Sequence, residues 1–191
     1  MNSHDYKMAL SLQAIISKES FVMGTPTPAK LFNCYLDSDG PVADFDKALK
    51  ESGLHTDEFK HLPGIYLWLD VTEGAKQAIE TLKKLDDEGL IRVWILTKTP
   101  SNSPYAYTEK ILWYRKNFPW LEDRVIISHD KHLMGGQKDF ILDDRPHKAN
   151  ADKFKGTFVL FRPEHAKADW ELFVDQIENQ IAKFESENPP L

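Results

Sequence analysis

The chain has 191 residues, of which 41% are hydrophobic and 28% are charged. This length and composition predict one soluble domain, since no apolar run approaches the roughly 18 residues that a membrane-spanning helix needs. The formal net charge is -6 and no long block of Lys or Arg is present, which disfavours polymeric nucleic acid as the first partner. A small anionic substrate is compatible with this net charge, because a bound metal ion and a few well-placed cations can make the local electrostatic potential positive.

The N-terminal part and the single cysteine give two further expectations. The N-terminus lacks a basic start followed by an apolar stretch, so we expect no secretory signal and a cytoplasmic protein. Cys34 lies inside an apolar run, which predicts a buried thiol and no internal disulfide.

Hydrophobic spacing and turn residues predict three parts along the chain. Residues 1–30 are predicted to hold an N-terminal helix, at about 8–18, and a linker rich in Gly, Thr and Pro. Residues 31–165 are predicted to form the core, with a short insertion at about 45–63. Residues 166–191 are predicted to contain a C-terminal helix that packs on this core.

Short apolar runs alternate with amphipathic stretches throughout the core. The runs predict strands at 31–36, 91–96, 125–128, 140–142 and 157–161. The amphipathic stretches predict helices at about 46–54, 71–88, 107–117 and 169–184. Such alternation is typical of an α/β fold with a doubly wound parallel sheet, in which ligands bind beyond the carboxyl ends of the strands.

Polar side chains follow four of these predicted strands. They are Asp37 and Asp39, then Thr97, then Lys131, and finally Asp143 and Asp144. Because the carboxyl ends of parallel strands share one edge of the sheet, we expect these groups to converge.

Several carboxylates at one edge would repel one another unless a hard divalent cation lay among them, and we expect this cation to be Mg2+. Magnesium takes part of its octahedron from substrate phosphate, and a lysine and a threonine hydroxyl can bind the oxygens of a transferring phosphoryl group. Two neighbouring aspartates can then take different roles in the reaction. Asp37 is predicted to attack phosphorus, and Asp39 to handle the proton of the leaving oxygen.

The motifs resemble those of haloacid-dehalogenase-like phosphatases, and within that superfamily the 5'(3')-deoxyribonucleotidases. The resembling segments are Asp37-Ser38-Asp39-Gly40-Pro41-Val42-Ala43-Asp44-Phe45, Pro63-Gly64-Ile65-Tyr66-Leu67, Ile95-Leu96-Thr97 with Glu109-Lys110-x-x-Trp113, and Asp130-Lys131 with Ile141-Leu142-Asp143-Asp144-Arg145-Pro146. The resemblance covers roughly residues 31–162.

The resemblance implies a role for each motif residue. Asp37 would be the nucleophile and Asp39 the acid and base. Thr97 and Lys131 would hold the phosphate, and we add Lys98, which departs from the family pattern beside Thr97. Asp37, Asp144 and the backbone carbonyl of Asp39 would bind magnesium. Asp143 would support the site by positioning water or the lysine.

The segment between Asp44 and Pro63 is much shorter than the helical cap of the nucleotidases, which predicts a more open site. The aromatic residues available either to stack on a base or to pack the core are Phe45, Tyr66, Trp68, Tyr105 and Tyr107.

Taken together, these features predict a magnesium-dependent phosphomonoesterase with a phosphoaspartyl intermediate, favouring a nucleoside or deoxynucleoside monophosphate. One alternative is a phosphatase for another small metabolite or for a polynucleotide end. The other is a non-catalytic phosphate-binding or receiver-like module. In a receiver domain the acidic pair comes first along the chain, whereas Asp143 and Asp144 come last here.

Overall fold

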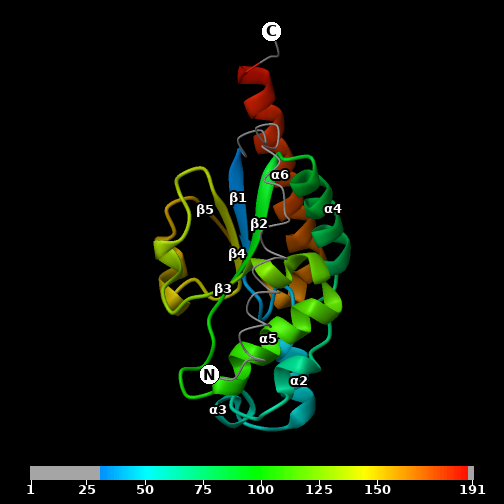
Figure 1. Cartoon of the computed structure of the whole chain (residues 1–191), viewed down its shortest axis with the longest axis vertical. Coiled ribbons are helices and arrows are strands. Elements are labelled where there is room, and N and C mark those ends of the chain that lie inside the picture. The colour runs from blue at the N-terminus through cyan, green and yellow to red at the C-terminus, as the bar shows by residue number, and fades with distance from the viewer. Residues whose placement is uncertain (1–30, 189–191) are drawn as a thin grey trace, which may run out of the picture.

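The computed structural model describes residues 31–188, so the helix and linker predicted for 1–30 lie outside the described residues. Five parallel strands form one sheet, in the order β3-β2-β1-β4-β5 (Figure 1). The strands are β1 (Phe32–Leu36), β2 (Ile91–Thr97), β3 (Val125–Ile127), β4 (Phe140–Asp143) and β5 (Thr157–Leu160). The predicted α/β fold with a parallel sheet is confirmed.

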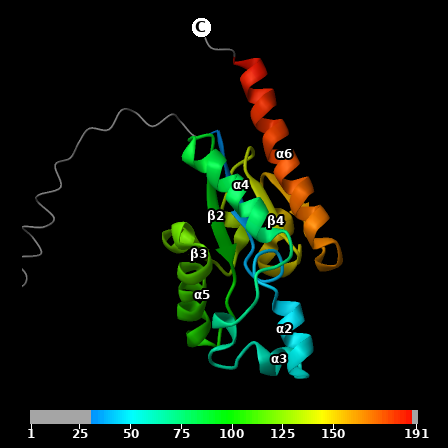
Figure 2. The same cartoon turned by 90° about the vertical axis from the view of Figure 1, so that its right-hand side faces the viewer.

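Five α-helices connect or follow these strands. They are α2 (Phe45–Ser52), α3 (Thr56–Phe59), α4 (Ala75–Asp87), α5 (Pro104–Asn117) and α6 (Ala166–Glu187). Figure 2 shows α4 and α6 side by side, with α2 and α3 together at the opposite end of the molecule from the end of α6. The sequence did not predict α3, because its single turn is too short to show a helical hydrophobic period.

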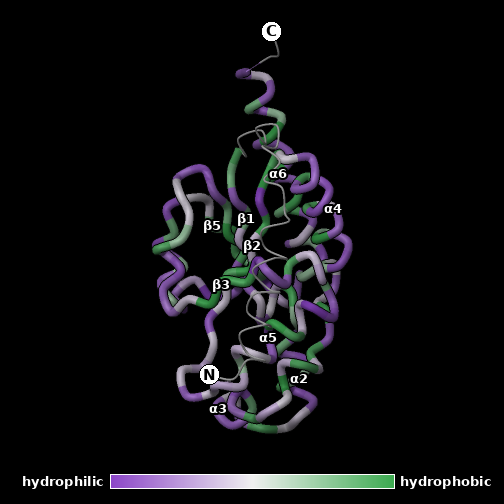
Figure 3. Tube along the Cα trace, viewed as in Figure 1, coloured by the Kyte–Doolittle hydropathy of each residue, from purple (hydrophilic) through white to green (hydrophobic). Residues whose placement is uncertain are grey.

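The two faces of the sheet are covered differently. Alternate residues of β1 and β2, such as Cys34 and Ile95, face the main core, to which α4, α5 and α6 contribute. Tyr35 and Leu96 face a smaller cluster that Phe154 and Met134 cover from the segments around β4. Figure 3 shows that hydrophobic residues recur along the central strands, as burial on both faces requires.

The order of the strands places a topological switch point at β1. This strand pairs with β2 on one side and with β4 on the other. The sheet therefore extends from β1 in two directions, through β2 to β3 on one side and through β4 to β5 on the other. In open parallel sheets such a divergence leaves a crevice beyond the carboxyl ends of the strands. Because all five strands run in the same direction, the carboxyl ends of β1, β2 and β4 lie at this crevice.

Candidate active site

The loop after β1 is held by hydrogen bonds from several parts of the chain. The backbone N–H of Asp37 donates to the carbonyl of Leu142 in β4 at 2.9 Å. The Thr72 hydroxyl donates to the carbonyl of Gly40 at 2.7 Å, and the Trp170 indole N–H of α6 donates to the carbonyl of Pro41 at 2.9 Å. These contacts fix the turn that carries Asp37 and Asp39.

Asp37 forms a close ion pair with Lys131. Both side chains are buried, and Lys131 Nζ lies 2.8 Å from Asp37 Oδ1. Burial alone would raise the pKa of Asp37, but Lys131, with help from Arg145 and Lys110, holds that pKa below its ordinary value. Asp37 is therefore an ionised carboxylate, the form that its predicted role as a nucleophile requires.

Lys131 also contacts Asp143, with Nζ 2.6 Å from Oδ2. Although burial opposes the charged form, Asp37 and Asp143 raise the pKa of Lys131 above its ordinary value. A permanently charged ammonium group thus lies between two carboxylates, where it can bind a phosphate oxygen.

Asp39 forms a buried ion pair with Lys110, which projects from α5. Lys110 Nζ also donates to the hydroxyl of Thr97 at 3.2 Å and lies 4.8 Å from the centre of the Tyr66 ring. The resemblance included Lys110 in a matched segment, but no role was predicted for it. Lys110 lies on the buried face of α5, with Glu109, Trp113 and Tyr114, and this placement indicates that the lysine belongs to the site.

Thr97 lies at the end of β2 and is almost fully buried. Its hydroxyl is engaged by Lys110 and the residue is not among those lining the pocket, whereas Thr99 is. The Thr99 hydroxyl is buried and has no hydrogen-bond partner within residues 31–188. Thr97 thus contacts the site through its hydrogen bond with Lys110 and does not line the pocket itself.

Two further carboxylates lie beside Asp37 and form an acidic cluster of three with it. Oxygen atoms of Asp37, Asp143 and Asp144 lie within 4.8 Å of one another. Burial, followed by the charge of Asp37, raises the pKa of Asp143 to about 6 and that of Asp144 to about 7. Such mutual repulsion among oxygen donors fits a hard divalent cation, which would relieve it.

The three carboxylates differ in the contacts they already make. Asp143 is held by Lys131 at one oxygen and by the backbone N–H of Arg145, at 2.9 Å, at the other. Within residues 31–188, Asp144 forms an ion pair only with the Arg145 side chain, whose Nε lies 3.2 Å from Oδ2. The side chain of Asp39 lies outside this acidic cluster.

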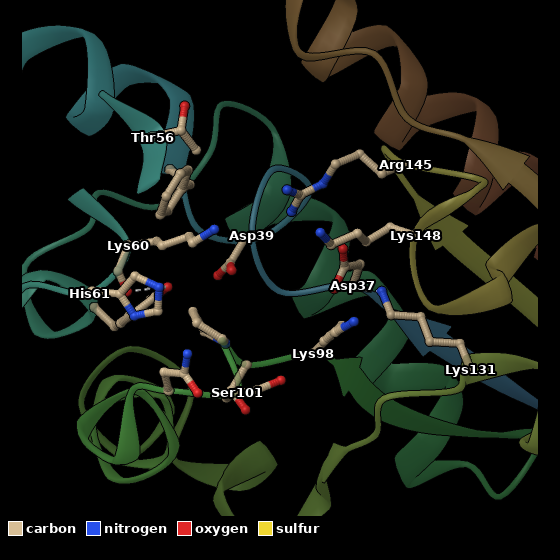
Figure 4. A pocket seen from close by; sticks show the side chains of 15 residues that line it. Asp37, Asp39, Thr56, Lys60, His61, Lys98, Ser101, Lys131, Arg145 and Lys148 are labelled. Carbon is tan, nitrogen blue, oxygen red and sulfur yellow. Dashed lines mark hydrogen bonds and ion pairs between the residues drawn. The ribbon is translucent and has the colours of Figure 1, made fainter. Parts of the chain in front are cut away.

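A pocket of about 300 Å³ opens over these groups (Figure 4). Its polar lining includes Asp37, Asp39, Lys98, Lys131, Arg145 and Lys148. Of the five aromatic residues considered from the sequence, Phe45 and Tyr66 line it, and their rings stack on each other with centroids 6.1 Å apart. Trp68 is largely exposed, and the ammonium group of Lys116 lies over its ring.

A parallel sheet whose central strand is followed by two aspartates, with a lysine after β3 and an acidic pair at the end of β4, defines a haloacid-dehalogenase-like phosphatase. The family profile that matches this chain is that of the 5' nucleotidase, deoxy (pyrimidine), cytosolic type C protein, over residues 42–173. The match covers more than half of the chain, and the protein belongs to this family of nucleotidases.

The matched range begins at Val42, so Asp37 and Asp39 precede it. A search of the curated proteins found no match. Within residues 31–188 no helix combines the length and the hydropathy needed to cross a membrane.

Proposed function

We propose that this nucleotidase is a magnesium-dependent phosphomonoesterase that forms a phosphoaspartyl intermediate at Asp37. The observation that carries the proposal is the position of Asp37. Its ionised carboxylate lines the pocket, contacts Lys131 and adjoins Asp143 and Asp144. Nucleophile, cationic phosphate ligand and acidic cluster thus meet at one point.

In the first step, a carboxylate oxygen of Asp37 attacks the phosphorus of the bound monoester. The bond between phosphorus and the ester oxygen breaks, and Asp39 gives a proton to that leaving oxygen. Lys131 contacts Asp37 and is the cation best placed to stabilise charge on the phosphoryl oxygens.

In the second step, Asp39 takes a proton from a water molecule as that water attacks the phosphorus. The bond between phosphorus and Asp37 breaks, which releases phosphate and regenerates the carboxylate. Lys110 contacts Asp39 and would hold its carboxylate in place through both transfers.

Asp37 and Asp144 would hold the magnesium ion, with the backbone carbonyl of Asp39, and Asp143 would support them through its contact with Lys131. When bound, the ion would neutralise negative charge on the phosphoryl group. The choice of Mg2+ rests on the all-oxygen donor set.

A nucleoside or deoxynucleoside monophosphate is the favoured substrate, and the cytoplasm the favoured location. The family name supports both, and Phe45 and Tyr66 offer aromatic surface at the pocket. Lys98 also lines the pocket and would bind a phosphate group of the substrate, whether the reacting one or another, from the side of β2.

The test is phosphate release from a panel of phosphomonoesters, with and without Mg2+, by the parent protein, Asp37→Asn and Asp39→Asn. We expect turnover that requires Mg2+, is abolished in Asp37→Asn and is greatest with nucleotides. If no member of the panel gives Mg2+-dependent release, the proposal is wrong. Equal rates with sugar phosphates would remove the nucleotide preference while keeping the reaction.

A further inference from the structure

Four cationic side chains surround the outer part of the pocket, in addition to Lys131 at its floor. They come from separate elements: Lys60 follows α3, Lys98 follows β2, and Arg145 and Lys148 follow β4. Figure 4 shows these side chains directed from different sides toward the space in front of Asp37 and Asp39. Together with Lys131, these side chains place five cationic groups around the pocket.

The two aspartates that line the pocket do not account for Lys98 and Lys148. Asp37 is paired with Lys131, and Asp39 with Lys110, both of them buried lysines. Each of these two carboxylates therefore has its own ammonium partner.

Two of the four outer cations are paired, and two are not. Lys60 pairs with Asp57, and Arg145 with Asp144. Lys98 and Lys148 make no ion pair and donate no side-chain hydrogen bond to any of residues 31–188. Both are free to bind an anion that enters the pocket.

The unpaired lysines also repel each other. Burial, then Lys98, Arg145 and Lys60, lower the pKa of Lys148, which places four cations within electrostatic reach of one another. Folding brings these like charges together at a cost, and an anion placed among them would relieve it.

We propose that Lys98 and Lys148, with Lys60 opposite, bind a second phosphate carried by the leaving group of the substrate. The preferred substrate is then a phosphomonoester with another phosphate, such as a nucleoside bisphosphate or the phosphorylated end of an oligonucleotide. This inference rests on the proposed function, since it concerns the substrate of the same site.

General attraction of anions is the competing explanation. A diffuse positive field would speed the capture of every phosphomonoester, whereas a built subsite favours a substrate whose second phosphate reaches the lysines. The two explanations therefore differ in a ratio of specificities between substrates.

The experiment compares thymidine 5'-monophosphate, thymidine 3',5'-bisphosphate and a 5'-phosphorylated thymidine dinucleotide, by kcat/KM for release of the 5'-phosphate. We expect one or both of the doubly phosphorylated substrates to exceed the monophosphate about tenfold, as one charge-assisted contact allows. A preference for the bisphosphate points to a free nucleotide, and one for the dinucleotide to a polynucleotide end.

The variant is Lys148→Met, and the matched control is Lys155→Met, an exposed lysine outside the pocket. Lys148→Met should bring the ratio between doubly and singly phosphorylated substrates close to one, and Lys155→Met should leave that ratio unchanged. Equal kcat/KM values for all three substrates in the parent would overturn the inference. So would a ratio that Lys148→Met does not alter.

A binding measurement separates this inference from the proposed function. Calorimetry with Asp37→Asn compares the affinities of the monophosphate and the bisphosphate without any turnover. If the parent hydrolyses no monoester, the proposed function fails, yet a bisphosphate preference that depends on Lys148 would still support the subsite. Equal affinities would contradict the subsite even if the enzyme were active.

Discussion

Lys110, in the middle of α5, forms a buried ion pair with Asp39, on the loop after β1. Folding therefore joins the predicted acid and base to a helix that lies far from it in the sequence. The same ammonium group donates to Thr97, so three elements meet at one side chain. The position of α5 therefore helps to determine where the carboxylate of Asp39 lies.

Lys110→Met should lower kcat by about a hundredfold, because Asp39 would lose the partner that holds it for proton transfer. Steady-state kinetics with a nucleotide substrate measures the effect. The control is Lys116→Met on the same helix, where the lysine is exposed and lies over Trp68. If both variants keep parental kcat, Lys110 does not act on Asp39.

Gly40→Ala should weaken Mg2+ binding as well as stability. Gly40 has a φ of 101°, and a Cβ there would lie 2.9 Å from the Cγ and Oδ2 atoms of Asp144. A left-handed backbone costs an L-residue such as alanine about 1–2 kcal/mol, and the clash would in addition displace a predicted metal ligand. Mg2+ affinity can be followed by calorimetry.

Gly53→Ala is the matched control for this prediction. Gly53 also has a positive φ, of 67°, but a Cβ there would meet nothing within 4 Å. Both variants should lose stability, and only Gly40→Ala should lose Mg2+ affinity. Equal Mg2+ affinities in the two variants would contradict the placement of Asp144.

Trp170→Phe should destabilise the protein, since the buried carbonyl of Pro41 would lose its donor. An unsatisfied buried carbonyl costs about 1–3 kcal/mol, which urea unfolding can measure. Trp68→Phe is the control, because Trp68 is 77% exposed and should change stability by less than about 0.5 kcal/mol. Equal losses would show that the Trp170 contact does not stabilise the loop.

Asp144→Asn should stabilise the metal-free protein, and increasingly so as the pH rises from about 4 to about 7. Folding raises the pKa of Asp144 from 3.8 to about 7, so the folded state binds its proton more tightly than the unfolded state. Parent stability contributed by this group is present at low pH and is lost as the pH rises through this window. Asparagine cannot ionise and removes that loss.

The measurement is the difference in melting temperature between Asp144→Asn and the parent, with a chelator, at several pH values. Asp175→Asn is the control, because its carboxylate is exposed on α6. With Mg2+ at pH 8 the order should reverse, since the parent gains more from the cation. A difference that does not vary with pH would contradict the raised pKa.

Much of this fold could be predicted because its signals are local. Apolar runs ending in Asp37, Thr97 or Asp143 identify buried strands, and parallel pairing then brings their ends to one edge. The residue types at these ends were enough to indicate phosphate chemistry with a divalent cation.

The contacts of Lys110 and Lys148 could not be predicted in this way. Whether a lysine is buried against Asp39, or lies unpaired at the mouth of a pocket, depends on how α5 and the loop after β4 pack in three dimensions. The same holds for Thr97, whose hydroxyl is bound by Lys110 beneath the pocket surface.

Trapping of a covalent intermediate tests the central claim most directly. The parent protein is mixed with a nucleoside monophosphate and Mg2+, and the reaction is quenched in acid within a single turnover. The protein is then digested and analysed by mass spectrometry. The account predicts one phosphoryl group on the peptide that contains Asp37, as an alkali-labile acyl phosphate, and none in Asp37→Asn. Turnover by the parent with no phosphorylated peptide, or with the phosphoryl group on another residue, would contradict it.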